Sequence, residues 1–348
     1  RAGAGNRSKR PGPLRIAIWC LEAVVLFSAV VYFFLLPALS SSESQSGKPA
    51  PDKPRHRGQP VPVLGSQALE MPGLREVSTA MLSPLEDLPT GGAIAQKTQR
   101  LVAEEEKLPV EVKNSLGISF RLVPQGSFLM GSPAGEAGRW EGEVQHVATV
   151  PRPFYMSKYE ITQHQWRRLM KRNPSHFRGA QRPVEEVSWH DIRAFIRKLC
   201  DREGLERGVY RLPREKEWEY ACRAGTETAF YFGNDVAWLK HFAIFLGSSQ
   251  GQTEAVGAKR PNAFGLYNMH GNVWEWCLNQ FRHYPDFAGK NPYRDWRVVR
   301  GGHWRGEALR CRSANRSHLP PASHGNMLGF RLVREIVAFE GEPLKELP

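Results

Sequence analysis

Glu275 is the residue whose surroundings most need a chemical explanation, because it is the one acid in the stretch NAFGLYNMHGNVWEW, residues 262–276. Trp274 and Trp276 flank it, and a carboxylate among apolar rings is costly without a partner. The Gly and Asn residues of the stretch can turn oxygen ligands toward a metal ion. The partner is therefore expected to be either such an ion or an arginine, and the candidate arginines are Arg300 and Arg312.

Five cysteines offer a second kind of chemistry. No two of them form a CxxC pair, so a zinc knuckle or a thioredoxin-like motif is not supported. Cys200 lies on the apolar stripe of a predicted helix and is expected to be buried. Cys222, Cys277 and Cys311 are expected either to form disulfides, which persist in exported proteins, or to be buried as thiols.

Amphipathic helices are predicted to position these side chains. The clearest one is VSWHDIRAFIRKLCDREG, with Ser188 as N-cap, Asp191 three residues later and Gly204 at its end. A second helix, in YEITQHQWRRLMKRNP, is capped by Thr162 and stops before Pro174.

A third, shorter helix in RLPREKEWEYACRAG is opened by Pro213 and ended by Gly225. In SFRLVPQGSFLMGS, alternating apolar residues and a turn at Gln125-Gly126 predict a hairpin. The segment LGFRLVRE alternates like an edge or return strand. Few helices, many short strands and long ordered loops predict a mixed α+β domain without internal repeats.

The N-terminus predicts a membrane anchor. Residues 1–13 form a basic flank, and residues 14–37 are mostly apolar, with Glu22 as the one acid. That run is long enough to span a bilayer as a helix and exceeds the apolar core of a cleaved signal peptide. Because the positive flank comes first, we expect a single-pass signal anchor with a cytoplasmic N-terminus and an extracytoplasmic domain. A cleaved signal is the alternative, since small residues follow at Ala38 to Ser40.

Residues 38–112 are rich in Pro, Ser and charge, which predicts a flexible linker with one short helix around Thr98 to Lys107. The folded domain is predicted at 113–336 and a tail at 337–348. The formal charge is +13, but the Lys and Arg residues are scattered without a basic helix or stripe. Nucleic acid is therefore not an expected partner.

Seven segments occur in order through the predicted domain: VPQGSFLMGS, PFYMSKYEITQHQW, PVEEVSWHDIRAF, YRLPREKEWEYACRAG, NAFGLYNMHGNVWEWC, VVRGGHW and LGFRLV. In these motifs the chain resembles the formylglycine-generating enzymes, also called sulfatase-modifying factors. The resemblance implies a single irregular domain related to C-type lectins, poor in regular secondary structure and usually stabilised by calcium. For authentic members it implies oxidation of a sulfatase cysteine to formylglycine, using oxygen and copper held by two cysteines.

The resemblance also implies where calcium would bind. Family members hold the ion on a side-chain amide, two backbone carbonyls and a glutamate of one loop. The matching positions are Asn268, Gly271, Val273 and Glu275.

The catalytic cysteine pair of the family is not matched. Authentic enzymes read Gly-Gly-Ser-aromatic, then a cysteine, then a second cysteine five residues later. Here His303 stands at the serine position and Gly306 at the first cysteine position. Cys311 falls at the second position if no gap is allowed, or on the following strand if CRSANR is the anchor. Because copper(I) needs two soft ligands, and His303 is the only nearby substitute, Cys311 remains the single catalytic candidate.

The resemblance bears on disulfides as well. Relatives link the position of Cys222 to the strand that Cys311 enters, which makes a Cys222–Cys311 bridge the expected disulfide, with Cys277 as a competitor.

Two classes of function follow. In the first, the domain is a calcium-stabilised recognition module that binds an extended peptide or a glycan at the outer membrane face. In the second, it is an oxidase that modifies exported sulfatases. The missing cysteine at Gly306 favours the first, and a structural anchor in a cell-surface assembly is a third possibility. The residues expected to line the binding cleft are Trp274, His303, Trp304, Arg312 and Arg316.

Overall fold

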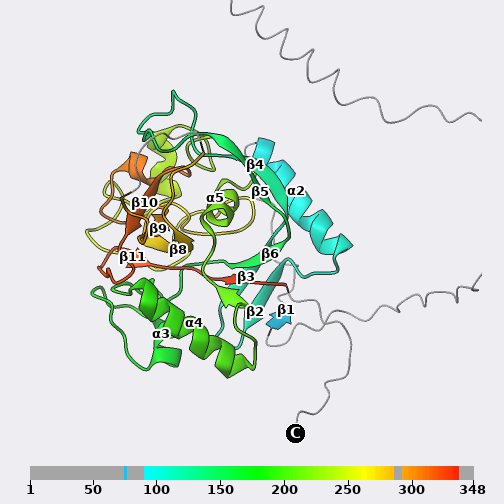
Figure 1. Ribbon diagram of the computed structural model, residues 1–348, viewed down its shortest axis with the longest axis vertical. Coiled ribbons are helices and arrows are strands. Elements are labelled where there is room, and N and C mark those ends of the chain that lie inside the picture. Colours follow the sequence, from blue (N-terminus) through cyan, green and yellow to red (C-terminus); the bar gives the residue numbers. More distant parts are fainter. Residues whose placement is uncertain (1–73, 77–89, 286–291, 337–348) are drawn as a thin grey trace, which may run out of the picture. The chain divides into compact units, whose positions relative to one another are not determined.

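The structure is a computed structural model that describes residues 74–76, 90–285 and 292–336. Its strands form three sheets with the orders β1-β2-β3-β6-β12-β7, β10-β9-β8-β11 and β4-β5 (Figure 1). The first sheet contains β1 (Leu74–Glu76), β2 (Glu111–Asn114), β3 (Ser119–Val123), β6 (Phe154–Ser157), β12 (Val333–Arg334) and β7 (Tyr210–Arg211). The second contains β10 (Arg316–Leu319), β9 (Arg297–Arg300), β8 (Trp274–Gln280) and β11 (Leu328–Gly329). The third pairs β4 (Gly126–Met130) with β5 (His146–Val150).

The described helices are α2 (Thr90–Glu105), α3 (Gln163–Met170), α4 (Trp189–Glu203) and α5 (Glu215–Arg223), with two 3-10 turns at Val236–His241 and Ala308–Cys311. The predicted start of α3 is confirmed, because Thr162 and Gln165 form a capping box. The predicted start of α4 is confirmed in the same way by Ser188 and Asp191. Few helices, short strands and long ordered loops make the mixed helix-and-sheet domain that the sequence predicts.

The hydrophobic core connects the helices to the sheets. Trp166 of α3 stacks on Phe195 of α4 with ring centroids 5.2 Å apart, and both rings meet Phe330 edge-on. All three side chains are fully buried. Aromatic contacts of this kind stabilise a core beyond the area that they bury, so α3 and α4 are fixed to the segment between β11 and β12.

The predicted hairpin at Gln125-Gly126 is wrong. β3 pairs with β2 and β6, whereas β4 pairs with β5 in a different sheet. The chain therefore changes sheets at this turn instead of folding back on itself. The reason is that β2 and β6 occupy the two edges of β3, so neither edge is free to pair with β4.

The predicted final strand is divided between two sheets. Residues Leu328–Gly329 pair in parallel with β8, and Val333–Arg334 lie between β6 and β7. Every residue from 328 to 334 is buried. A period of two in the sequence indicates one solvated face, but here even the polar Arg331 and Arg334 find partners inside the domain.

The predicted linker ends too late at residue 112. α2 begins at Thr90 and extends the short helix expected around residues 98–107 toward the N-terminus. Its Val102 and Ala103 belong to the main hydrophobic cluster. The buried Gln99 side chain donates hydrogen bonds to the backbone carbonyls of Leu122 at 2.5 Å and Phe264 at 3.1 Å. Because few α2 residues are apolar and one anchor is an amide, the composition of the segment concealed its packing.

A close backbone contact fixes the start of α2. A Cβ atom added to Gly91 would lie 2.1 Å from the carbonyl oxygen of Gly225, the residue that follows the C-cap of α5. A Cβ atom added to Gly225 would clash with the Gly91 carbonyl oxygen in the same way. Two glycines therefore let α2 lie directly against the end of α5.

Among the described residues, none of the helices combines the length and the apolar character needed to cross a bilayer. The predicted basic flank at 1–13, the anchor at 14–37 and the tail at 337–348 lie outside the described residues.

Candidate functional site

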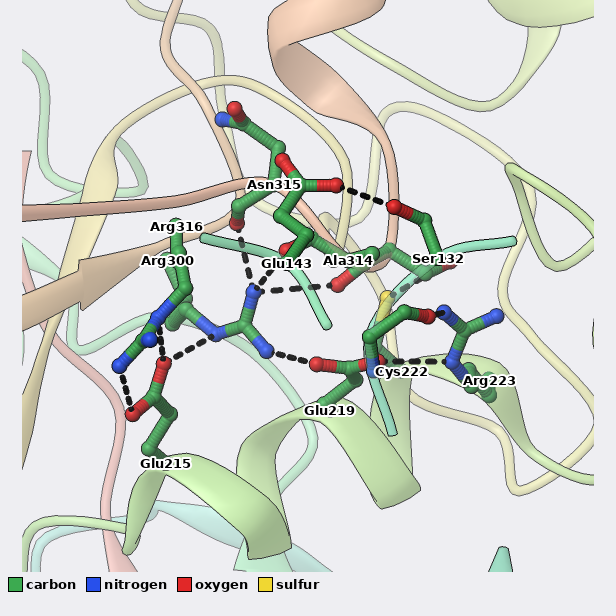
Figure 2. A network of polar contacts seen from close by, with 12 residues as sticks. Ser132, Glu143, Glu215, Glu219, Cys222, Arg223, Arg300, Ala314, Asn315 and Arg316 are labelled. Atoms are coloured by element: carbon green, nitrogen blue, oxygen red, sulfur yellow. Dashed lines mark hydrogen bonds and ion pairs between the residues drawn. The ribbon is translucent and has the colours of Figure 1, made fainter. Parts of the chain in front are cut away.

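A buried ionic network joins α5 to the second sheet (Figure 2). α5 presents Glu215 and Glu219 one turn apart. Arg300, at the end of β9, forms an ion pair with Glu219 and places its Nε 3.6 Å from Glu215 Oε1. Arg316, at the start of β10, binds both oxygens of Glu215 at 2.7 and 2.8 Å. Since all four side chains are buried and each charge has an opposite partner, the network fixes the two strands to the helix.

Arg300 also closes the loop between β9 and β10. Its Nη1 donates to the carbonyl oxygens of Ala314 at 2.8 Å and Asn315 at 2.7 Å (Figure 2). At the other end of the loop, Gly302 has a φ of +80°, and a Cβ atom there would lie 2.8 Å from the Cys311 sulfur. The loop of residues 301–315 is therefore held at both ends, and it carries four of the predicted site residues, namely His303, Trp304, Cys311 and Arg312.

An aromatic face, which we define as Trp274, His303, Trp304 and Phe177, lies on this loop and its neighbours. The Trp274 and His303 rings are 5.9 Å apart, and Trp304 meets Phe177 perpendicularly at 5.2 Å. Trp304 is 8% exposed, while the other three are half-buried. The structure thus brings together three of the five residues predicted to bind a ligand.

His303 is a neutral imidazole on this face. Its Nδ1 accepts a hydrogen bond from the Arg305 backbone N–H at 3.2 Å, so a neutral ring carries its proton on Nε2. Burial, aided by the Arg305 charge, lowers the imidazole pKa to about 4. Near the loop, Leu246 donates its backbone N–H to Gly306 and leaves 59% of its own surface exposed. Aromatic, aliphatic and neutral hydrogen-bonding groups are therefore all available to a ligand.

Arg312 and Arg316 do not belong to that face, which corrects the prediction that they line a cleft. The Arg312 guanidinium is buried against Glu143 at 2.8 and 2.9 Å and Glu136 at 2.5 Å. Arg316 pairs with Glu215 and lies 3.9 Å from the ring centre of Tyr284. Both arginines hold the framework together, because every buried charge here needs a partner.

The protein-family model of the sulfatase-modifying factor enzyme 1-like domain matches residues 107–336 of this chain. The chain belongs to the sulfatase-modifying factor family.

Three similar proteins illustrate the range of the family. The chaperone protein LppX of Paenibacillus barcinonensis is 31% identical over 43% of this chain and 69% of its own length. The formylglycine-generating enzyme of Streptomyces coelicolor is 33% identical over 44% of this chain and 52% of its own length. The chain thus spans about half the length of that enzyme. The solved structure of Treponema denticola variable protein 1 aligns with a TM-score of 0.60 and 26% identity, covering 66% of this chain and 100% of that one.

The residues at the catalytic position of the family do not fit a copper site. Gly306 supplies no ligand, and a Cβ atom there would lie only 3.2 Å from the His303 carbonyl oxygen. The Cys311 thiol is fully buried, and burial raises its pKa to about 12. Copper(I) binds thiolates, and position 306 holds a glycine where the enzymes of the family have a cysteine. These residues therefore do not supply the pair of ligands that a copper-dependent step needs.

The four described cysteines, Cys200, Cys222, Cys277 and Cys311, are free and buried, so the expected Cys222–Cys311 bridge is not formed. The Cys222 sulfur instead lies 3.7 Å from the Ser313 hydroxyl and 3.9 Å from His270 Nδ1. Simple burial, the alternative that the sequence left open, is what the structure contains.

The loop predicted to bind calcium turns tightly. Asn268, Gly271 and Asn272 all have φ between +57° and +81°. A Cβ atom at Gly271 would lie 2.1 Å from the Ile244 carbonyl oxygen, so only glycine fits. The Asn268 side-chain oxygen accepts a hydrogen bond from the Gly257 N–H at 2.9 Å.

Glu275 has an arginine partner, but neither of the two expected from the sequence. Arg331 binds its two carboxylate oxygens at 2.6 and 2.7 Å, and the Trp218 indole N–H donates to it at 2.7 Å. The arginine comes from the LGFRLV motif, 56 positions away. No local spacing rule connects the two residues.

Glu160 is a site residue that sequence reasoning missed. It is fully buried, and the Asn272 amide donates to its Oε2 at 3.3 Å, while no described residue donates a hydrogen bond to its Oε1. Burial, together with the nearby Glu275 charge, raises its pKa well above the usual range. Glu275 and Glu160 thus lie near one arginine, and the raised pKa favours the protonated form of Glu160. Their oxygen atoms are donors of the hard type that calcium binds. The sequence signal that could have identified Glu160 is its position two residues before the Thr162 N-cap, with the apolar Ile161 between them.

Proposed function

We propose that the domain is a non-catalytic recognition module of the sulfatase-modifying factor family, carried at the outer membrane face by an anchor at residues 14–37. In this proposal the aromatic face binds an extended peptide or a glycan. The observation that carries it is the pair formed by Gly306 and the buried thiol of Cys311, since oxidation in this family requires two cysteines that can ligate copper.

The chemistry of the aromatic face supports binding. Trp274 can stack on a sugar ring or an apolar side chain, and His303 can donate from Nε2 without carrying a charge. The exposed Leu246 adds apolar area beside the Gly306 backbone. The name of LppX, a chaperone, supports a role other than oxidation for a related domain.

The experiment incubates the copper-treated full chain with a peptide carrying Cys-x-Pro-x-Arg and measures aldehyde by mass spectrometry. We expect no aldehyde. In parallel, panels of immobilised peptides and glycans are screened for binding. For any ligand found, Trp274→Ala is expected to weaken binding by roughly tenfold or more, as for a central aromatic contact.

Trp238→Ala is the matched control, because Trp238 is 56% exposed on the 3-10 turn at Val236–His241 and lies outside the aromatic face. Aldehyde that is formed by the wild type and lost in Cys311→Ser would replace the recognition proposal with the oxidase alternative. If Trp274→Ala and Trp238→Ala weaken binding equally, the ligand does not bind at the aromatic face.

We further propose that calcium stabilises the domain through Asn268 and Glu275, the carbonyls of Gly271 and Val273, and Glu160 as an added ligand. The ion would supply the positive charge that the two buried carboxylates lack. A ligand that binds only the folded state stabilises it by about 2.7 kcal/mol at one hundred times its dissociation constant. We therefore expect a chelator to lower the melting temperature of the full chain.

Two isosteric variants distinguish the ion from the salt bridge. Without calcium, Glu275→Gln is expected to destabilise the domain, because it weakens the contact to buried Arg331. Glu160→Gln is expected to be close to neutral without calcium, because the raised pKa already favours the uncharged form of Glu160, yet to lose most of the chelator response. An unchanged wild-type melting temperature on chelation would eliminate the calcium site.

A further inference from the structure

A cavity of about 360 Å³ lies where the connection from β5 to β6, the edge strand β7 and the start of α5 meet. Its apolar wall consists of Val150, Pro151 and Phe154. Its charged wall consists of four cations and two carboxylates, namely Arg152, Arg211, Arg214, Lys216, Glu217 and Glu335. We call this cavity the basic cleft, and none of its residues belongs to the aromatic face or to the network of Arg300.

Both carboxylates of the basic cleft are already engaged by the protein. Arg211 binds the two oxygens of Glu217 at 2.6 and 2.9 Å, and its Nε donates to Glu335 at 2.5 Å. Glu217 also accepts from the backbone N–H of Arg214 at 2.8 Å and from the Arg214 guanidinium at 3.0 Å. Four hydrogen bonds use the acceptor capacity of this carboxylate, so it has none left for a cationic ligand.

Two of the cations have no carboxylate partner. No ion pair among the described residues involves Arg152, which is exposed, or Lys216, which is half-buried. Arg214 is exposed and shares its one carboxylate with Arg211. Because four cations face two carboxylates, the cleft lining carries a net charge of +2.

The fold creates this concentration of charge, which is not visible in the sequence. Arg152 follows β5, whereas Lys216 lies in the first turn of α5, and these two elements are neighbours (Figure 1). Like charges in one cavity repel each other, and the protein walls strengthen their field because they exclude water. A ligand with two negative charges would neutralise the lining, so the cleft favours an anion.

The shape and composition of the cleft indicate the kind of anion. Nucleic acids are bound by a basic stripe that follows their charged backbone, whereas this is a single cavity of the size that accepts a few side chains. The planar guanidinium of Arg214 suits a carboxylate. The apolar wall at Pro151 suits the methylene groups that precede a carboxylate in glutamate.

We propose that the basic cleft docks an acidic, extended segment of a partner protein, with neighbouring Glu or Asp side chains between Arg152, Arg214 and Lys216. Two carboxylates of that segment supply the negative charge that the lining lacks. The proposal does not depend on the function of the aromatic face.

The probe is a fluorescein-labelled peptide of consecutive glutamates between two glycines, and its control has glutamine at every glutamate position. Binding to the full chain is measured by fluorescence anisotropy at low and at physiological salt. We expect the glutamate peptide to bind saturably and the glutamine peptide not to bind. Binding should weaken at the higher salt concentration, because exposed charges are screened.

The double variant Arg152→Gln with Lys216→Gln is expected to bind the glutamate peptide about tenfold more weakly, because two partly exposed charge contacts are lost. The matched control is Arg197→Gln with Lys198→Gln, on an exposed part of α4 outside the cleft. It removes the same net charge and should bind nearly as the wild type does. A carbodiimide, which joins a carboxylate to an amine in direct contact, should link the peptide to Lys216 and not to Lys198.

The proposal is overturned if the glutamate peptide does not bind saturably, or if the two double variants bind it equally, since the peptide would then follow net charge alone. Cross-links confined to lysines outside the cleft would overturn it as well. Tighter cleft-dependent binding of a short sulfated oligosaccharide would assign the cleft to glycans instead. A dimer in sedimentation velocity that only the cleft variant dissociates would assign it to a second copy of this chain.

Discussion

Replacing Arg300 with methionine is expected to lower the free energy of unfolding by about 3–5 kcal/mol, the usual cost of breaking a buried ion pair. Methionine keeps the unbranched stem of the side chain but lacks the guanidinium group, which leaves the Glu219 carboxylate with less compensating charge. It also removes the donors to the carbonyls of Ala314 and Asn315. Since folded proteins are stable by only about 5–15 kcal/mol, denaturant unfolding of the full chain would reveal so large a loss clearly.

Arg310→Met provides the matched control, because Arg310 lies in the same loop with an exposed side chain. Its unfolding curve should resemble that of the wild type. A second measurement distinguishes the network from ordinary packing. Arg300→Met should also speed tryptic cleavage after the exposed Arg305, since the loop loses the contacts that hold its Ala314–Asn315 end. Wild-type unfolding and cleavage of Arg300→Met would show that the network does not hold the loop.

His270 is expected to make the domain sensitive to mild acid. The imidazole is fully buried, its Nε2 accepts the Tyr231 backbone N–H at 3.2 Å, and burial lowers its pKa to about 3. Protonation would place one N–H donor against another. Because the folded-state pKa lies below the unfolded value near 6.5, the stabilising effect is complete above pH 6.5 and decreases as the pH falls toward 3. The loss should reach about 2 kcal/mol by pH 5.

Other buried groups also change protonation in this pH range. The lowered pKa values of His303 and His318 add losses of the same sign, whereas the raised pKa values of Glu160 and Glu185 work in the opposite direction. The measurement is therefore a difference in slope. Unfolding free energies are compared from pH 7 to 5 for the wild type, for His270→Asn and for the exposed control His241→Asn. His270→Asn should give the shallowest slope, and equal slopes in all three proteins would refute the role of His270.

The local features of the fold were predictable because their causes are local. The capping boxes at Thr162 and Ser188 are spacing rules within one turn of a helix. The Gln125-Gly126 turn also has a local signature, yet it separates two sheets instead of closing a hairpin. Which strand lies beside β3 depends on β6 and β2, and neither is specified by the residues of the turn.

In the candidate site too, locally determined features were predictable and long-range contacts were not. The sequence motifs that contain Trp274, His303 and Trp304 also determine the local loop geometry, and the structure places these three residues together. Arg312 was misplaced because a charged residue in a loop usually faces solvent, whereas Glu136 and Glu143 bury this one. The partner of Glu275 could not be identified, because Arg331 reaches it only through the pairing of β11 with β8 and the turn that follows.

The contact between Gly91 and Gly225 has a mechanical consequence. If the chain before Leu74 is attached to a membrane, tension on it reaches β1 first, and it reaches α2 only after β1 has separated from β2. The glycine pair at the end of α5 and the amide of Gln99 then bear the load before the other strands of the sheet. Widening that contact with Gly91→Ala would therefore make α2 detach at a lower force once β1 is lost, while the ionic network of Arg300 and Glu219 remained intact.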